Sequence, residues 1–90
     1  MKKIYAKIYA LSVGTTPTIL YENQNRVGLL IQNNSSNTLY LLSQGNDTAQ
    51  SIVISAGATY RNDVAPQGEY QLIASAATSD IRVEEDICQS

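Results

Sequence analysis

Apolar residues alternate with polar ones in short runs along most of this chain, and that period of two residues is the strongest constraint on its fold. The runs have the length of strands and cover residues 4–11, 18–22, 27–33, 38–43, 51–57, 58–62, 70–75 and 81–84. No segment keeps a helical period over three turns, and no helical segments separate the runs. The pattern predicts seven or eight short strands.

Residues that favour turns separate these runs at intervals of roughly 8 to 12 residues. Glycine, proline, asparagine and serine supply most of them, at 14–17, 23–26, 33–37, 44–50 and 65–68. We therefore predict an all-β fold, a small antiparallel β-sandwich or jelly roll, and a length of 90 residues suits a single domain over 1–90. Within it, we expect 1–12 to form an edge strand or an arm and 87–90 to form a frayed tail.

Two runs also indicate which strand faces are covered. The first run has an aliphatic face and a face with two tyrosines and a lysine, namely Ile4, Ala6, Ile8 and Ala10 against Tyr5, Lys7 and Tyr9. We predict that the aliphatic face is the inner one, so that the other forms an outward stripe, which contacts either a partner or the same chain. The nearly continuous apolar run 27–33 predicts a central strand covered on both faces. Its Gly28 predicts a bulge or a close approach of other groups.

Tyrosine is the only aromatic residue type in the chain and occurs six times. A tyrosine buries apolar area and keeps a polar tip, so it suits both the edge of a core and a protein interface. We predict that Tyr40, Tyr60 and Tyr70 lie at the edge of the core.

Charge is small in total but uneven along the chain. The net charge of −2 argues against a nucleic-acid partner, because phosphate recognition needs a clustered excess of lysine and arginine. The two ends have opposite charge, so a basic start could contact the acidic end of a neighbouring copy; the alternative is that the first and last strands pair within one chain. The candidate contact residues are Lys2, Lys3, Tyr5, Lys7, Tyr9, Glu84, Glu85 and Asp86.

The sequence contains no histidine, which removes the common catalytic triads and the usual ligand of zinc and iron sites. The carboxylates Glu84, Glu85 and Asp86 are consecutive, so in a strand they alternate between opposite faces and form a poor acid–base pair. We predict no catalytic residue, no metal site and no cofactor. The protein is therefore expected not to be an enzyme.

The start of the chain lacks the residue pattern of a signal peptide or of a membrane-spanning segment. Lys7 and two tyrosines interrupt the apolar residues that follow the first lysines, and no apolar run approaches the ~20 residues of a spanning helix. Cys88 is the only cysteine, which excludes a disulfide within the chain. We expect a soluble, unprocessed protein that is made inside the cell and has no membrane partner.

Four segments, taken in order, carry a family resemblance: RVGLLIQNNSSNTLYL, SIVISAGATY, PQGEYQLIAS and IRVEE. An arginine precedes an apolar strand that ends in Gln-Asn, an Asn/Ser turn leads into a Leu-Tyr strand, and an Ala-Gly turn closes a further strand. Over about residues 13–86, the chain resembles small β-sandwich virion proteins of tailed bacteriophages.

This resemblance implies a structural role in a virion and brings no catalytic residues with it. The first expectation is a capsid decoration, or cement, protein made in the host cytoplasm and bound to the capsid surface, where it contacts the major capsid protein and its own copies. Symmetric capsid positions favour cyclic oligomers, with a trimer as the first guess. The alternative is a tail or head-fibre accessory module that binds another virion protein or a host surface glycan, with Tyr5, Tyr9 or Tyr60 stacking on the sugar.

Overall fold

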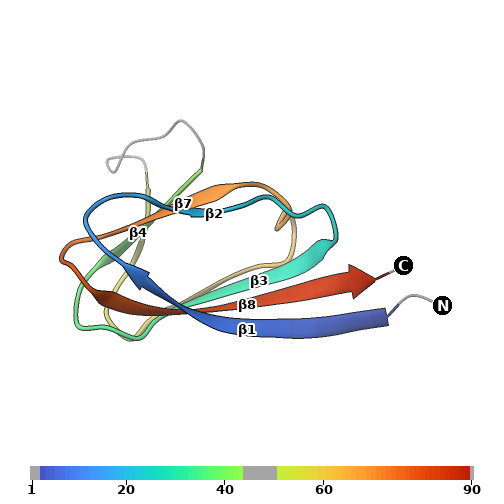
Figure 1. The fold of residues 1–90 in the computed structure, drawn as a ribbon, viewed down its shortest axis with the longest axis horizontal. Helices are drawn as coiled ribbons and strands as arrows, with labels where there is room; N and C mark the ends of the chain where they lie inside the picture. The colour runs from blue at the N-terminus through green and yellow to red at the C-terminus, as the bar shows by residue number, and fades with distance from the viewer. Residues whose placement is uncertain (1–2, 44–50, 90) are drawn as a thin grey trace.

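The computed structural model describes residues 3–43 and 51–89, and these form two antiparallel four-stranded sheets (Figure 1). The first sheet has the order β1(Lys3–Val13), β8(Ser79–Gln89), β3(Arg26–Asn33), β6(Thr59–Asn62). The second has the order β2(Thr18–Leu20), β7(Tyr70–Ala74), β4(Leu39–Ser43), β5(Ile52–Ile54). Successive strands mostly alternate between the sheets, which makes the fold a jelly roll and confirms the predicted all-β class. The predicted turn at 44–50 lies outside the described residues.

The core lies between the two sheets and is built from inward-facing residues of both. Its buried aliphatic members are Val13, Leu20, Leu29, Ile31, Leu39, Leu41, Ile54, Leu72, Ala74, Ile81 and Val83. Tyr60 and Tyr70 are half-buried and pack against this cluster, and Tyr40 is half-buried as well. The predicted position at the edge of the core is confirmed for Tyr60 and Tyr70, whereas Tyr40 alternates with the buried Leu39 and Leu41 and lies on the other face of β4.

Strand β3 lies inside its sheet, between β8 and β6, but only one of its faces is covered. Leu29 and Ile31 are buried in the core, whereas Leu30 is half-buried and Gln32 is exposed on the opposite face. The prediction that both faces are covered was wrong, because no third layer of described residues stacks on the outer side of the first sheet. The predicted bulge is confirmed, since the register between β3 and β8 shifts between Arg26 and Gly28.

The faces of β1 are the reverse of the prediction. Ile4 and Ile8 are 64% and 67% exposed, whereas Val13 is buried and Leu11 and Tyr9 are half-buried. Side chains in a strand alternate between its two faces, so the burial of Val13 turns every odd-numbered residue inward. The aliphatic face is therefore the outer one.

Strands β1 and β8 form a continuous antiparallel ribbon that pairs every residue from Lys3 with Gln89 to Val13 with Ser79. Residues 87–89, predicted to be a frayed tail, are part of β8, and Ile87 is buried. β1 occupies the edge of its sheet. β1 begins and β8 ends at one end of the molecule, where the ribbon extends past the second sheet (Figure 1).

Candidate interaction surface

The edge strand β1 is exposed over six consecutive residues, 3–8, although each of them pairs with β8. Among the described strands, β8 is its only partner in the sheet, so the backbone groups on its other side have no strand beside them. The other edge strands β2, β5 and β6 have three or four residues, whereas β1 has eleven, without proline or a shift in register. A long, regular edge of this kind is a template for pairing with another strand.

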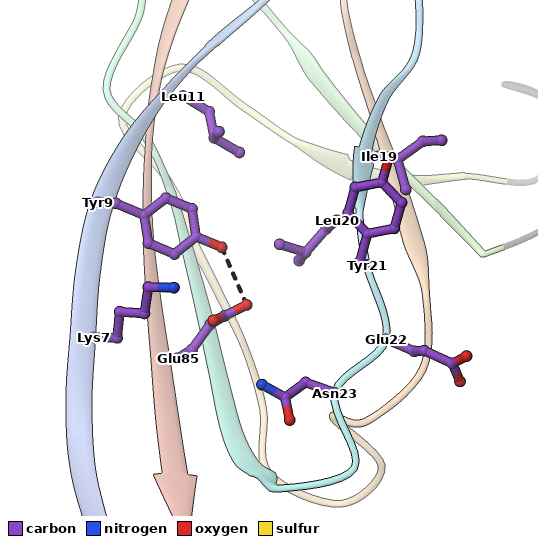
Figure 2. A pocket seen from close by; sticks show the side chains of 9 residues that line it. All are labelled: Lys7, Tyr9, Leu11, Ile19, Leu20, Tyr21, Glu22, Asn23 and Glu85. Atoms are coloured by element: carbon purple, nitrogen blue, oxygen red, sulfur yellow. Dashed lines mark hydrogen bonds between the residues drawn. The ribbon is translucent and has the colours of Figure 1, made fainter.

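A groove of about 340 Å³ opens between the edge strands of the two sheets (Figure 2). Its lining combines aliphatic, aromatic and charged side chains: Lys7, Tyr9 and Leu11 from β1, Ile19, Leu20, Tyr21, Glu22 and Asn23 from β2 and the residues after it, and Glu85 from β8. On one side of the groove, the Tyr9 hydroxyl is directed at the carboxylate of Glu85 (Figure 2). The ring of Tyr21 lies on the other side. The groove therefore has one wall from each sheet.

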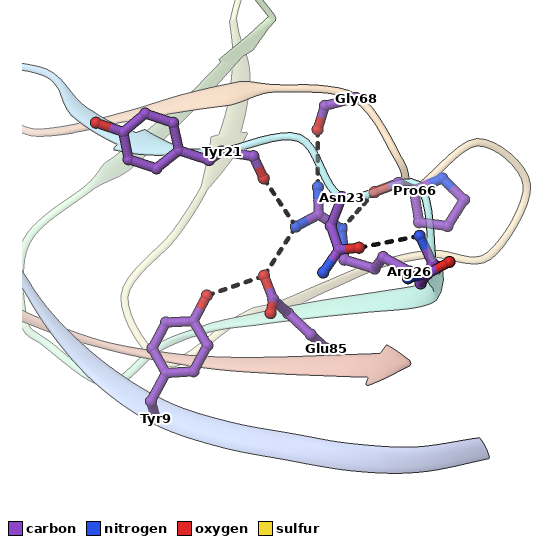
Figure 3. A network of polar contacts seen from close by, with 8 residues as sticks. Tyr9, Tyr21, Asn23, Arg26, Pro66, Gly68 and Glu85 are labelled. Carbon is purple, nitrogen blue, oxygen red and sulfur yellow. Dashed lines mark hydrogen bonds and ion pairs between the residues drawn. The ribbon is translucent and has the colours of Figure 1, made fainter. Parts of the chain in front are cut away.

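A buried network of polar groups holds one end of this groove (Figure 3). Arg26 is fully buried, and its Nη1 lies 2.8 Å from Oε1 of Glu85. The same guanidinium donates hydrogen bonds to the backbone carbonyls of Tyr21, Pro66 and Gly68. A charged group loses a large solvation energy on burial, and this set of partners compensates for that loss. Arg26 thus ties β3 to β8 and to the loops that close this end of the sandwich.

Tyr9 joins β1 to the network. Its hydroxyl donates a hydrogen bond of 3.1 Å to Oε1 of Glu85. Burial raises the pKa of Tyr9 far above its usual value of 10, and the negative charge of Glu85 and this hydrogen bond raise it further, while Arg26 acts in the opposite direction. Lys7 Nζ lies 5.5 Å from the centre of the Tyr9 ring, within reach of a cation–π interaction. Neutral Tyr9 therefore fastens the edge strand to the core.

The outer face of β8 carries the remaining acidic candidates, which are paired with an arginine of β6. Arg61 Nη2 lies 2.9 Å from Oδ2 of Asp86, and Arg61 Nη1 lies 3.9 Å from Oε2 of Glu84. Arg61 also contacts Asp63 at 2.9 Å. Hydrogen bonding to Asp86 is the main reason that the pKa of Glu84 is raised. Both carboxylates already have a positive partner within the chain.

The sequence-predicted contact residues thus divide into separate groups. Lys3, Tyr5 and Lys7 are exposed on the ribbon, Tyr9 and Glu85 belong to the buried network, and Glu84 and Asp86 lie on the opposite face, while Lys2 lies outside the described residues. The first and last strands pair within one chain, which was the alternative considered from the sequence. In the part of the chain that the structure describes, none of these acids forms an ion pair with a lysine.

Sequence reasoning missed Arg26, which it assigned to a polar turn. The residue begins β3 and is the largest fully buried side chain. The available signal was Gly28, because a bulge at that position changes which side chains point inward and directs the arginine before it to the core side.

Within 3–43 and 51–89, no group of three or more histidine, cysteine, aspartate or glutamate side chains could hold a metal ion. The same residues contain no helix of the length and apolarity needed to cross a membrane.

Comparison with known proteins identifies the fold. No family model matches the chain, and no curated protein sequence matches it. Among solved structures, a subunit of Bacillus endospore appendages, which form disulfide-linked pili, aligns over 100% of this chain and 92% of its own with a TM-score of 0.56 and 16% identity. A cupin domain from Bordetella pertussis Tohama I aligns over 97% of this chain and 82% of its own, with a TM-score of 0.51 and 14% identity.

A third similar structure is dTDP-4-dehydrorhamnose 3,5-epimerase from Bacillus anthracis, with a TM-score of 0.51 and 12% identity. It is matched over 96% of this chain, which spans 53% of the epimerase. At such identities the likeness concerns the fold alone. Fold and surface together define a small jelly-roll protein with a long exposed edge strand.

Proposed function

We propose that this chain is a non-enzymatic structural protein of a phage particle, and that it decorates the capsid as a cement protein. The observation that carries the proposal is the β1 edge, eleven residues long and exposed over 3–8, beside a body without a described metal site. The order of sequence segments that resembles phage virion proteins supports the location. The appendage subunit supports the assembly role, since a similar fold serves there as a building block of a fibre.

The interior of the sandwich also supports a role without catalysis. The similar folds include an epimerase, so the fold itself leaves the activity open. In this chain the polar groups that point inward beside the groove, Arg26, Glu85 and Tyr9, bind each other and backbone carbonyls. These bonds hold β1, β3 and β8 together, which suits a rigid body that presents an edge to its partners.

The test is quantitative mass spectrometry of purified particles of the phage that encodes the chain, with the major capsid protein as the internal standard. A cement protein occupies symmetric positions over the whole shell, so the chain should be present in hundreds of copies. Absence from mature particles would contradict a virion role. A copy number of about six to twelve, the symmetry of a tail, would contradict decoration of the capsid.

A tail or fibre module that binds a host glycan is the second candidate, and the groove favours it through one residue. Tyr21 is 70% exposed at the rim, next to Glu22 and Asn23, where an aromatic ring could stack on a sugar. Of the tyrosines considered from the sequence, Tyr9 and Tyr60 are half-buried, and Tyr5 is exposed on β1 but does not line the groove. Binding on a glycan array that is lost in Tyr21→Ala, and kept in Tyr40→Ala, would support this role; a blank array would remove it.

A further inference from the structure

We propose that β1 of one copy pairs antiparallel with β1 of a second copy, in a register centred on Ala6, so that two four-stranded sheets become one sheet of eight strands. This inference deepens the proposed function by naming the partner of the β1 edge, and in that sense rests on it. Three features of β1 support this pairing: the residues over which it is exposed, the side chains that it presents, and the spacing of its charges.

The exposed part of β1 has the length that such pairing needs. In the Ala6-centred register, the described residues that pair are 3–9, and residues 3–8 are the exposed ones. The covered residues Leu11 and Val13 lie beyond this range and keep their positions against the core. The start of the ribbon extends past the second sheet (Figure 1), while Lys7 and Tyr9 line the groove that faces β2.

Side chains on both faces of β1 complement themselves in this register. On the outer face, Ile4 lies opposite Ile8 of the second copy, which covers two isoleucines that are 64% and 67% exposed. On the other face, Tyr5 lies opposite Lys7 of the second copy, and Lys3 opposite Tyr9. Within one chain, Lys7 Nζ already lies 5.5 Å from the centre of the Tyr9 ring, so this strand face is compatible with contacts between lysine and tyrosine.

Neighbouring registers place like charges or buried groups opposite each other. A centre at Tyr5 brings Lys3 opposite Lys7, and a centre at Lys7 brings that lysine opposite its own copy, which is unfavourable. A centre at Ile8 places Lys3 opposite Val13, which is fully buried in the core. The Ala6 register avoids all three conflicts.

A second copy of this chain fits the edge because the contact uses one strand twice. An antiparallel pair centred on one residue has two-fold symmetry, so every contact occurs twice, and the assembly closes as a dimer. The pairing supplies main-chain hydrogen bonds to the side of β1 that has no described strand beside it. A trimer would require a different surface, because this edge is fully used in the dimer.

Disulfide trapping tests the register. The variants Ala6→Cys, Ile8→Cys and Ala10→Cys, each with Cys88→Ser, would be oxidised and separated without reductant. Ala6 residues of the two copies face each other at ~5 Å, while residues 8 lie ~13 Å apart and residues 10 ~26 Å apart. A disulfide needs Cα atoms within ~7 Å, so only the Ala6→Cys variant should form covalent dimers. Faster trapping at position 8 or 10, or none at position 6, would overturn the proposed pairing.

Sedimentation equilibrium tests the interface without a cross-link. The parent should reach twice its 9.8 kDa mass, and Ile8→Lys, which removes both Ile4–Ile8 contacts, should return toward 9.8 kDa at the same concentration. Val53→Lys is the matched control, since Val53 is 58% exposed on the edge strand β5 and should leave the dimer intact. A monomeric parent, a dimer weakened only by Val53→Lys, or a three-chain mass that Ile8→Lys leaves unchanged would refute the proposal.

The two proposals fail separately. A dimer trapped at position 6, with the chain absent from mature particles, would keep the pairing and remove the virion role. Particles that contain hundreds of copies, together with a monomer that no position traps, would keep the virion role and remove the pairing.

Discussion

Among individual residues, Arg26 is the largest side chain that is fully buried. It forms an ion pair with Glu85 and supplies hydrogen bonds to three backbone carbonyls. Glu85 also accepts a hydrogen bond from the Tyr9 hydroxyl, so its carboxylate connects β3, β8 and the edge strand β1. The position of the β1 edge thus depends on an ion pair inside the sandwich.

Replacing Arg26 should be far more costly than replacing an exposed arginine. Arg26→Met leaves Glu85 buried without a positive partner and should lower the free energy of unfolding by about 3–5 kcal/mol in urea denaturation. Arg82→Met breaks an exposed pair with Asp80 and should cost about 0–1 kcal/mol. The double variant Arg26→Met/Glu85→Met should regain part of the loss. Equal losses for Arg26→Met and Arg82→Met would contradict this role.

Tyr9 makes the free energy of unfolding depend on pH in the alkaline range. Burial and Glu85 raise the pKa of Tyr9 in the folded chain, whereas an unfolded tyrosine ionises near pH 10. The stability from neutral Tyr9 is therefore complete below about pH 10 and decreases above it, because only the unfolded state gains from ionisation.

Urea denaturation between about pH 8 and 11 compares the parent with Tyr9→Phe. The variant should lose stability less steeply above pH 10, and the slope that remains should include Tyr60, whose pKa burial also raises. Parallel curves for the two proteins would show that Tyr9 does not titrate differently on folding.

Among the elements, β3 depends on its bulge. The register shift between Arg26 and Gly28 lets Arg26 face the core while Val27 remains exposed. At Gly28 the outer face is crowded: a Cβ atom there would lie 2.6 Å from Oδ2 of Asp86, and Arg61 holds that carboxylate in place. A side chain at position 28 would therefore displace this carboxylate and disturb its ion pair with Arg61.

Gly28→Ala should lower the free energy of unfolding by about 1–3 kcal/mol, the usual cost of inserting a methyl group into a filled site. Gly68→Ala is the matched control, because a Cβ atom there meets nothing within 4 Å and the residue does not have a positive φ. It should leave stability unchanged or raise it by about 0.4–1 kcal/mol. Thermal and urea unfolding give both values, and an equally destabilised Gly68→Ala would remove the explanation by crowding.

The sequence allowed the strands to be located but not all of their faces. Turn residues and alternation indicated each strand, because both are local properties of the chain. The inner face of β1 could not be assigned from 4–10, since both faces carry apolar side chains there, and the burial of Val13 at the far end decides it. The bulge that buries Arg26 was signalled by Gly28, but its partner Glu85 is 59 residues away and became visible only in the fold.

At the scale of the whole molecule, the two sheets enclose the core, and the outer edge of β1 has no described strand beside it. The ribbon of β1 and β8 lies along a molecule that measures 44 × 25 × 17 Å. Its acidic residues are paired internally with Arg26, Arg61 and Arg82, whereas the exposed lysines of β1 are not in ion pairs with them. An assembly through this side therefore brings positive charges together.

Salt dependence distinguishes two modes of assembly. Pairing of β1 with β1 places Lys3 and Lys7 of both copies on one pair of strands, so their repulsion should weaken as the Debye length falls from about 10 Å at 0.1 M to about 3 Å at 1 M. The dimer dissociation constant from sedimentation should then fall severalfold, and Lys7→Gln should reduce this effect. A contact between the lysines and the acidic end of a neighbour, as first considered from the sequence, would weaken with salt.

The pairing of the first strand with the last also sets the timing of folding. During synthesis β1 emerges from the ribosome before the other strands of the sandwich, but its partner β8 is complete only when residue 89 has been added. Until then, β1 has no intramolecular strand beside it on either side. During synthesis, closure of the ribbon must therefore follow the completion of β8, and the edge through which we expect copies to meet forms only after that step.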